Sequence, residues 1–137
     1  MSVVIGHVDN ASEVLGVHGG SGVLQWVRLA TGSHLEGNWD GFEWVALEPD
    51  GRAGLHTHTH TEEIWYFLRG TGTIVLDGES HDVSAGSIVI TPLNSSHAAH
   101  NTGSERLEYI VIEVLPPAIT DVLPARRTTD EPLQAQN

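Results

Sequence analysis

Apolar and polar residues alternate in short runs along most of the chain, and turn residues separate these runs about every eight to twelve positions. Asp77-Gly78 is a strong signal for a tight hairpin, and Pro116-Pro117 is expected to end the last run. No segment combines a helix cap with an apolar stripe of helical period. The pattern therefore predicts an all-β sandwich or barrel. The predicted strands are 3–5, 23–30, 42–47, 64–68, 73–76, one beginning at 79, 87–91, 97–101 and 106–115, with a histidine run before 64.

Other segments are less regular. Residues 18–22 contain three glycines and predict a flexible turn, and the Gly-bearing stretch 31–41 predicts a loop. From position 118 the composition shifts to Pro, Thr, Asp, Arg and Gln, which is typical of an irregular tail. We therefore expect one barrel domain over 1–117, with its functional core at 51–101, and a partly disordered tail over 118–137.

The histidine run is the most informative stretch for function. His56, His58 and His60 alternate, and Glu63 follows them. Alternate residues of a strand point to one face, so a continuous strand would present three imidazoles together. Such a face is poorly suited to an apolar core and well suited to a metal ion, because neutral imidazole and carboxylate are common ligands of transition metals.

Composition narrows the possible functions. The 137-residue chain has a formal net charge of −12, with 18 acidic residues against 6 basic ones, all of them Arg. This charge repels nucleic acid and anionic membranes. The absence of Lys excludes Schiff-base chemistry, and the absence of Cys excludes thiolate nucleophiles, disulfides and Cys-ligated metals. No signal peptide or membrane span is evident, so we expect a cytoplasmic protein.

Two stretches place Gly, His, Glu, Pro and Asn at regular intervals. The residues concerned are Gly51, His56, His58, Glu63 and Gly70 in the first stretch, and Gly86, Pro92, His97 and Asn101 in the second. In this spacing they resemble the two conserved motifs of the cupin superfamily. Gly51 is one place from the family position. Asn94 replaces a family Gly, but Asn tolerates a left-handed backbone, so we expect the turn to form.

The resemblance implies a double-stranded β-helix, which is a jelly-roll barrel. It also implies one divalent transition metal, either Fe, Zn, Mn or Ni, with open positions for water, substrate or dioxygen. The implied metal ligands are His56, His58, Glu63 and His97. Because imidazoles bind metal only when neutral, affinity should fall below a pH of roughly 6.5. The alternative is a metal-free barrel that keeps these residues by descent.

Further residues are candidates for catalysis or substrate binding. His60 is either a rim residue or a proton shuttle, and we treat it as the candidate catalytic residue. It also forms a second His-x-His pair with His58, although that pair lies too close to Glu63 for the family spacing. Trp65, Phe67 and Trp44 are candidate substrate-binding residues, with barrel core as the alternative.

Charged residues in the predicted strands raise two further expectations. Glu43 and Glu113 would be general-base candidates if they faced the barrel, and we expect at least one of them to face solvent. Arg28, Arg69 and Arg106 could bind a substrate carboxylate, but we expect each to form a solvated salt bridge.

The leading functional hypothesis is a metal-dependent enzyme that acts on a small organic molecule. Its chemistry would be non-redox, of the isomerase, cyclase or lyase type, in a biosynthetic pathway. One alternative is an Fe(II)-dependent dioxygenase, and another is a non-catalytic protein that binds a small ligand. The resemblance also implies a homodimer, since small cupins commonly pair their sheets or exchange N-terminal strands.

Overall fold

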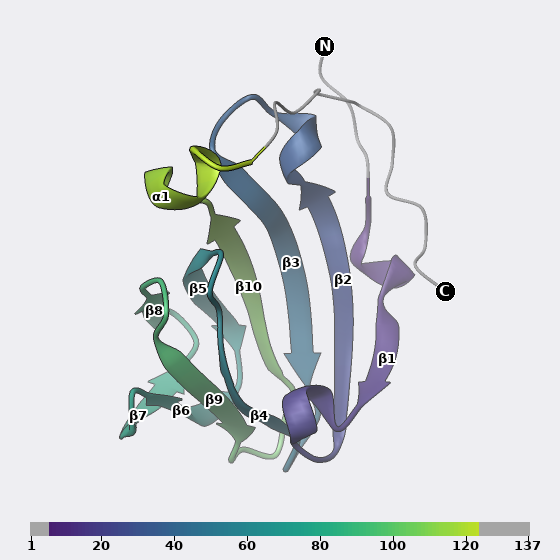
Figure 1. Cartoon of the computed structure of the whole chain (residues 1–137). Helices are drawn as coiled ribbons and strands as arrows, with labels where there is room; N and C mark the ends of the chain where they lie inside the picture. The colour runs from purple at the N-terminus through teal and green to yellow at the C-terminus, as the bar shows by residue number, and fades with distance from the viewer. Residues whose placement is uncertain (1–5, 124–137) are drawn as a thin grey trace.

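The structure is a computed structural model that describes residues 6–123, which form two antiparallel sheets in a jelly roll (Figure 1). The larger sheet contains β1 (Ser12–Leu15), β2 (Val23–Thr31), β3 (Trp39–Leu47), β5 (Glu62–Arg69), β8 (Ile88–Thr91) and β10 (Leu107–Val114). The smaller sheet contains β4 (Arg52–Thr57), β6 (Thr71–Leu76), β7 (Glu79–Ser84) and β9 (Ser96–Asn101). The helical segments are η1 (Val8–Asn10), η2 (Val17–Gly19), η3 (Gly32–His34) and α1 (Pro117–Thr120).

Strand β10 shows how the alternating pattern builds the core. It lies between β3 and β5 in the larger sheet, whose strand order is β1-β2-β3-β10-β5-β8. Leu107, Tyr109 and Val111 point inward and are at most 4% exposed, while the intervening residues are half-buried on the outer face. They pack with inward side chains of the smaller sheet, such as Ile74 and Ala99. Burying one face of each sheet is what holds the two layers together.

Two turns follow directly from residue type. Asp77 and Gly78 have φ angles of 47° and 85°, and positive φ at both central positions matches the twist of a tight hairpin. The predicted hairpin is therefore confirmed, and it joins β6 to β7. Asn94 has a φ of 66°, so it adopts the left-handed backbone expected of a residue that replaces glycine.

Most predicted strands are confirmed. The runs at 23–30, 42–47, 64–68, 73–76, 87–91, 97–101 and 106–115 correspond to β2, β3, β5, β6, β8, β9 and β10, and the strand from 79 corresponds to β7. The predicted strand at 3–5 lies outside the described residues, as do positions 124–137 of the predicted tail.

The structure also corrects several expectations. Residues 31–41 are not one loop, because η3 lies in them and β3 already begins at Trp39, where it pairs with Val114 of β10. The short helix α1 was not predicted. The histidine run is not a continuous strand: β4 ends at Thr57, opposite Ser96, the first residue of β9, so the backbone beyond it has no partner strand.

No helix within residues 6–123 is long and apolar enough to cross a membrane.

Candidate metal centre

Three imidazoles meet on the inner face of the smaller sheet, and we call them the imidazole cluster: His56, His58 and His97. His56 on β4 and His97 on β9 are cross-strand partners, and side chains directly opposite in this way lie close together. His58 follows the end of β4. One ring nitrogen from each residue lies within 4.8 Å of the others, which is compatible with three ligands around one ion.

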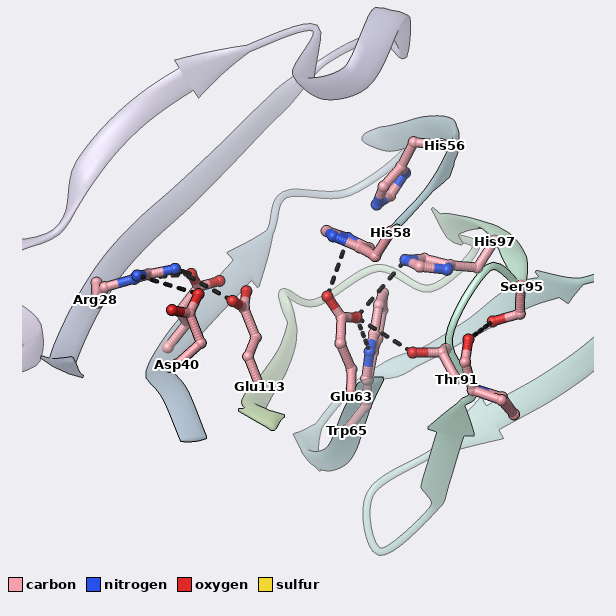
Figure 2. A network of polar contacts seen from close by, with 12 residues as sticks. Arg28, Asp40, His56, His58, Glu63, Trp65, Thr91, Ser95, His97 and Glu113 are labelled. Atoms are coloured by element: carbon pink, nitrogen blue, oxygen red, sulfur yellow. Dashed lines mark hydrogen bonds and ion pairs between the residues drawn. The ribbon is translucent and has the colours of Figure 1, made fainter. Parts of the chain in front are cut away.

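Glu63 reaches the imidazole cluster from the other sheet (Figure 2). Its Oε1 lies 3.0 Å from Nε2 of His58, and its Oε2 lies 3.6 Å from Nε2 of His97. The carboxylate is held in place by Trp65, whose Nε1 donates a 2.6 Å hydrogen bond to Oε2, and by the hydroxyl of Thr91, which donates at 3.5 Å. Glu63 is only 3% exposed, so these contacts fix its orientation.

The electrostatics of the imidazole cluster favour neutral rings at two positions. Burial lowers the pKa of His97 to about 4 and also lowers the pKa of His56. The hydrogen bond with Glu63 instead raises the pKa of His58. Burial alone would raise the pKa of Glu63, but the hydrogen bond from His58 and the nearby imidazoles lower it overall.

His97 supplies the clearest indication that the cluster fits a metal ion. It is fully buried, and neither of its ring nitrogens has a hydrogen-bond partner among the described residues. A buried polar atom without a partner costs about 1–3 kcal/mol, and native proteins keep few such atoms. Coordination of a divalent ion by neutral imidazole would satisfy Nε2, which already points toward Glu63.

A fourth histidine, His18, contacts the imidazole cluster, although the sequence predicts a flexible turn at this position. His18 lies in η2, and its ring stacks on that of His56 with centroids 3.7 Å apart and planes 15° apart. The segment lies so close to β4 that a Cβ on Gly20 or Gly54 would overlap the opposing backbone. The sequence does not show that Gly20, which follows η2, packs closely against Gly54 of β4. His18 was therefore not predicted as a site residue.

A cavity of about 350 Å³ opens beside the imidazole cluster. His18, His56, His58 and Glu63 line it together with apolar side chains of β1, β2, β3 and β10. Among the predicted substrate-binding residues, Trp65 lines this cavity. The cavity gives a small molecule access to the same atoms that could hold a metal.

A second polar group contributes two residues to the cavity wall, and we call it the carboxylate cluster: Asp40, Glu43 and Glu113 arranged around Arg28. Nη2 of Arg28 donates to Glu43 at 3.0 Å and to Glu113 at 3.2 Å, and its Nη1 lies 3.7 Å from Asp40. Both Glu43 and Glu113 line the cavity, so the expectation that at least one faces solvent is wrong. Burial, followed by the charge of Glu43, raises the pKa of Glu113 to about 9.

The sheet register explains this inward placement. Glu43 is opposite Val111 on β10, and Glu113 lies two positions further along the same strand. Residues two apart on a strand share a face, so both carboxylates join Val111 on the inner face. Arg28 on β2 is the cross-strand partner of Glu43. Its ion pairs are thus part-buried rather than solvated, unlike those of Arg69 with Glu105 and Arg106 with Glu48. 

The remaining predicted site residues lie away from the cavity. Phe67 is fully buried in the core between the sheets. Trp44 points to the opposite face from its neighbour Glu43, and its Nε1 donates a 2.9 Å hydrogen bond to Glu108. His60 is exposed, and its Nδ1 lies 3.0 Å from the hydroxyl of Thr59. A catalytic role for His60 stays a prediction that this placement does not support.

Comparisons with known proteins agree with the fold. A probable oxalate decarboxylase of Arthroderma benhamiae is 34% identical over 113 residues, which is 79% of this chain and 27% of that protein. Auxin-binding protein 1 of Arabidopsis thaliana is 32% identical over 97 residues, covering 63% of this chain and 48% of that one. The chain thus spans about half or less of the length of these curated relatives.

Among solved structures, a predicted oxalate decarboxylase of Thermotoga maritima superposes with a TM-score of 0.77 at 26% identity, covering 83% of this chain and all of that one. A family model, described as a cupin domain, matches residues 43–113. That segment runs from Glu43 on β3 to Glu113 on β10, contains the whole imidazole cluster, and makes up more than half of the chain. With this match, the protein belongs to the cupin family.

Proposed function

We propose that the protein is a metal-dependent enzyme that acts on a small organic molecule by non-redox chemistry of the isomerase, cyclase or lyase type. The observation that carries the proposal is the convergence of three imidazoles beside a cavity, with His97 fully buried and without a hydrogen bond. A barrel with a purely structural role has no use for such a residue, because an unpaired buried imidazole weakens the core.

The metal would be held by the imidazole cluster together with Glu63. When bound, a divalent ion supplies Lewis-acid polarisation of a carbonyl or hydroxyl oxygen. Residues of the chain orient the carboxylate and shield the site. Trp65 and Thr91 orient Glu63, and apolar side chains in the cavity wall, such as Val45 and Val111, limit access of water. A shielded site of this kind strengthens every charge interaction made inside it.

Two of the similar proteins support the lyase form of this proposal, since a decarboxylase is a lyase. Those names describe the other proteins, and a shared fold does not fix the reaction. An Fe(II)-dependent dioxygenase is the second candidate, favoured by a nitrogen-rich ligand set with one carboxylate. A non-catalytic small-ligand-binding protein is the third, and the similarity to an auxin-binding protein supports it.

The first experiment is elemental analysis of protein purified without a chelator or a histidine tag. We expect close to one divalent transition metal ion per chain in the wild type and its loss in His97→Ala. His81→Ala is the matched control, because His81 lies on β7 outside the cluster. Failure of the wild type to bind any such metal, even after reconstitution, would contradict the proposal.

Turnover of metal-loaded protein separates the three candidate functions. Consumption of oxalate, hydroxy acids or hydroxy ketones without oxygen uptake supports a lyase or isomerase. Oxygen uptake coupled to loss of a substrate would transfer the assignment to a dioxygenase. Tight binding of a ligand that is never converted, with affinity unchanged in His97→Ala, would favour the binding protein.

We also propose that two copies of the chain associate through the outer face of β5 and β8. Tyr66, Leu68, Ile88 and Ile90 are 43–63% exposed there, and β8 is an edge strand of its sheet. A contiguous apolar surface at a sheet edge is typical of an association site. Light scattering should give twice the chain mass for the wild type and a smaller mass for Ile88→Lys. A monomeric wild type would contradict this assembly.

A further inference from the structure

The cavity has two polar ends that differ in chemistry. His56, His58 and Glu63 in its wall offer metal ligands, and Glu43 and Glu113 of the carboxylate cluster also line it. Figure 2 shows Glu113 between the two groups, with His58 and Glu63 on one side of it and Arg28 and Asp40 on the other. A ligand that binds at the imidazole cluster can therefore also contact these two carboxyl groups.

Arg28 does not make this second end attractive to anions. Its Nε and Nη2 both donate to Oε1 of Glu43, Nη2 also donates to Glu113, and Nη1 lies near Asp40. Among the described residues that line the cavity there is no Arg. The guanidinium thus lies behind the two glutamates and holds them in place, and its charge is already matched by theirs.

The two ends are a short distance apart. Glu113 is directly opposite Glu63 across the β10–β5 pair, and Cβ atoms of such partners are about 4.5–5.5 Å apart. A molecule with a chain of about four carbon atoms could therefore contact both groups at once, and a cavity of about 350 Å³ has room for it. Val45 and Val111 also line the cavity and provide an apolar wall.

We propose that Glu43 and Glu113 determine specificity by hydrogen-bonding hydroxyl groups at an uncharged end of the substrate and by rejecting a second anionic group there. The substrate class is then a small hydroxylated molecule with at most one anionic end, which lies at the metal centre. This inference rests on the proposed function, because it requires the other end of the substrate to bind at the imidazole cluster.

The physical basis is the pairing of hydrogen-bond donors with acceptors in a place where water is scarce. A hydroxyl group donates one hydrogen bond and accepts another, so it can pair with Glu43 and Glu113 together. A carboxylate only accepts, and it would add a charge beside carboxyl groups that are at most 13% exposed in their side chains. Rejection of a wrong partner by such like-charge contact is an effective route to specificity. The raised pKa of Glu113 agrees, because burial and then the charge of Glu43 disfavour a further negative charge at this position.

The test uses four compounds that share a 2-hydroxycarboxylate head for the metal and differ only at the fourth carbon. They are 2-hydroxybutyrate with a methyl group, 2,4-dihydroxybutyrate with a hydroxyl, malate with a carboxylate, and 4-amino-2-hydroxybutyrate with an ammonium. Dissociation constants are measured on metal-loaded protein by calorimetry and by the fluorescence of Trp26 and Trp65, which line the cavity.

We expect 2,4-dihydroxybutyrate to bind at least tenfold more tightly than malate, with 2-hydroxybutyrate between them. Equal or tighter binding of malate would overturn the proposal, and so would a failure of all four compounds to bind. Tightest binding by the ammonium compound would replace the uncharged substrate class with a cationic one and would also overturn it. The metal content of each sample is measured first, so loss of the metal, which contradicts the proposed function, is distinguished from loss of this specificity.

Variants then assign the effect to the two residues. Glu43→Gln removes a charge but keeps hydrogen-bonding atoms, so we expect it to reduce the preference for the hydroxyl compound over malate several-fold. Glu113→Gln replaces a carboxyl group whose raised pKa keeps it protonated, so we expect it to reduce the same preference to a smaller extent. Glu108→Gln is the matched control, since Glu108 lies on the same strand as Glu113, accepts a hydrogen bond from Trp44 and is not part of the cavity wall. An unchanged preference in both cavity variants would overturn the assignment, and the wild-type series tests the proposal even if a variant fails to fold.

Discussion

The two ends of the cavity were assembled by the fold in different ways. The imidazole cluster draws its members from two neighbouring strands of the smaller sheet and from the turn after β4. The carboxylate cluster draws its members from β2, β3 and β10 of the larger sheet. One end carries a recognisable spacing in the chain and the other does not, although both line the same cavity. Sequence motifs therefore locate the chemistry of this protein more readily than its specificity.

The largest effect on this contrast is expected from His97→Ala. It removes a fully buried imidazole from the imidazole cluster and does not change any residue of the carboxylate cluster. We expect metal affinity to fall by more than about 100-fold, which exceeds the usual effect of residues that only support a ligand. Competition with a fluorescent chelator measures the affinity. A change of less than about tenfold would exclude His97 as a ligand.

Trp65→Phe should have the next largest effect. It removes the 2.6 Å hydrogen bond to Glu63 but keeps an aromatic ring against Tyr109. Loss of such an orienting partner typically lowers metal affinity by about 10–100-fold, and the same competition assay would show it. Trp44→Phe is the control, because its indole bonds Glu108 on the outer face. Equal losses in the two variants would mean that fold stability, and not the orientation of Glu63, is responsible.

Glu113→Gln should change how stability depends on pH. The pKa of Glu113 is raised to about 9 in the folded protein from an unfolded value of 4.5, so the folded state keeps a proton that the unfolded chain releases. Stability from this group therefore falls as pH rises between those values, and Gln removes that fall. Thermal denaturation should show the Tm of the variant rising relative to wild type from about pH 5 to about pH 8. The rise should reach roughly 10 °C, since each pH unit changes this contribution by up to about 1.4 kcal/mol and about 1 kcal/mol moves Tm by roughly 4 °C. A Tm difference that is independent of pH would contradict the assignment.

The smallest effect is expected at His18. The ring of His18 stacks on that of His56 with centroids 3.7 Å apart, so it supports the orientation of a candidate metal ligand. His18→Ala should lower metal affinity only a few-fold, and His18→Phe should restore most of it by keeping an aromatic ring in contact. No recovery in His18→Phe would show that the ring nitrogens of His18 are needed rather than its flat surface.

Much of the fold could be predicted because the evidence for it is local. Alternation along β10 and the Asp77-Gly78 turn each depend on residues next to one another in the chain. The end of β4 could not be predicted, because it is set by where β9 begins. The segment carrying β1 and η2 was also unpredictable, since its order comes from pairing with β2 and close contact with β4.

The candidate site shows the same division. The convergence of His56, His58 and His97 agrees with the motif spacing, whereas the inward direction of both Glu43 and Glu113 required the register of β3 with β10. Alternation alone gives the relative direction of residues within one strand. It does not state which face of that strand meets the cavity.

The placement of the two clusters in separate sheets has a consequence for how such a protein can diversify. Positions 43 and 113 can change without altering the histidines, because no strand of the carboxylate cluster carries a member of the imidazole cluster. A lineage could therefore change the residues at these positions of the cavity wall while retaining the imidazole cluster. Insertions within β10 would not offer that freedom, since one added residue would rotate Glu113 away from the cavity and Val111 out of the core.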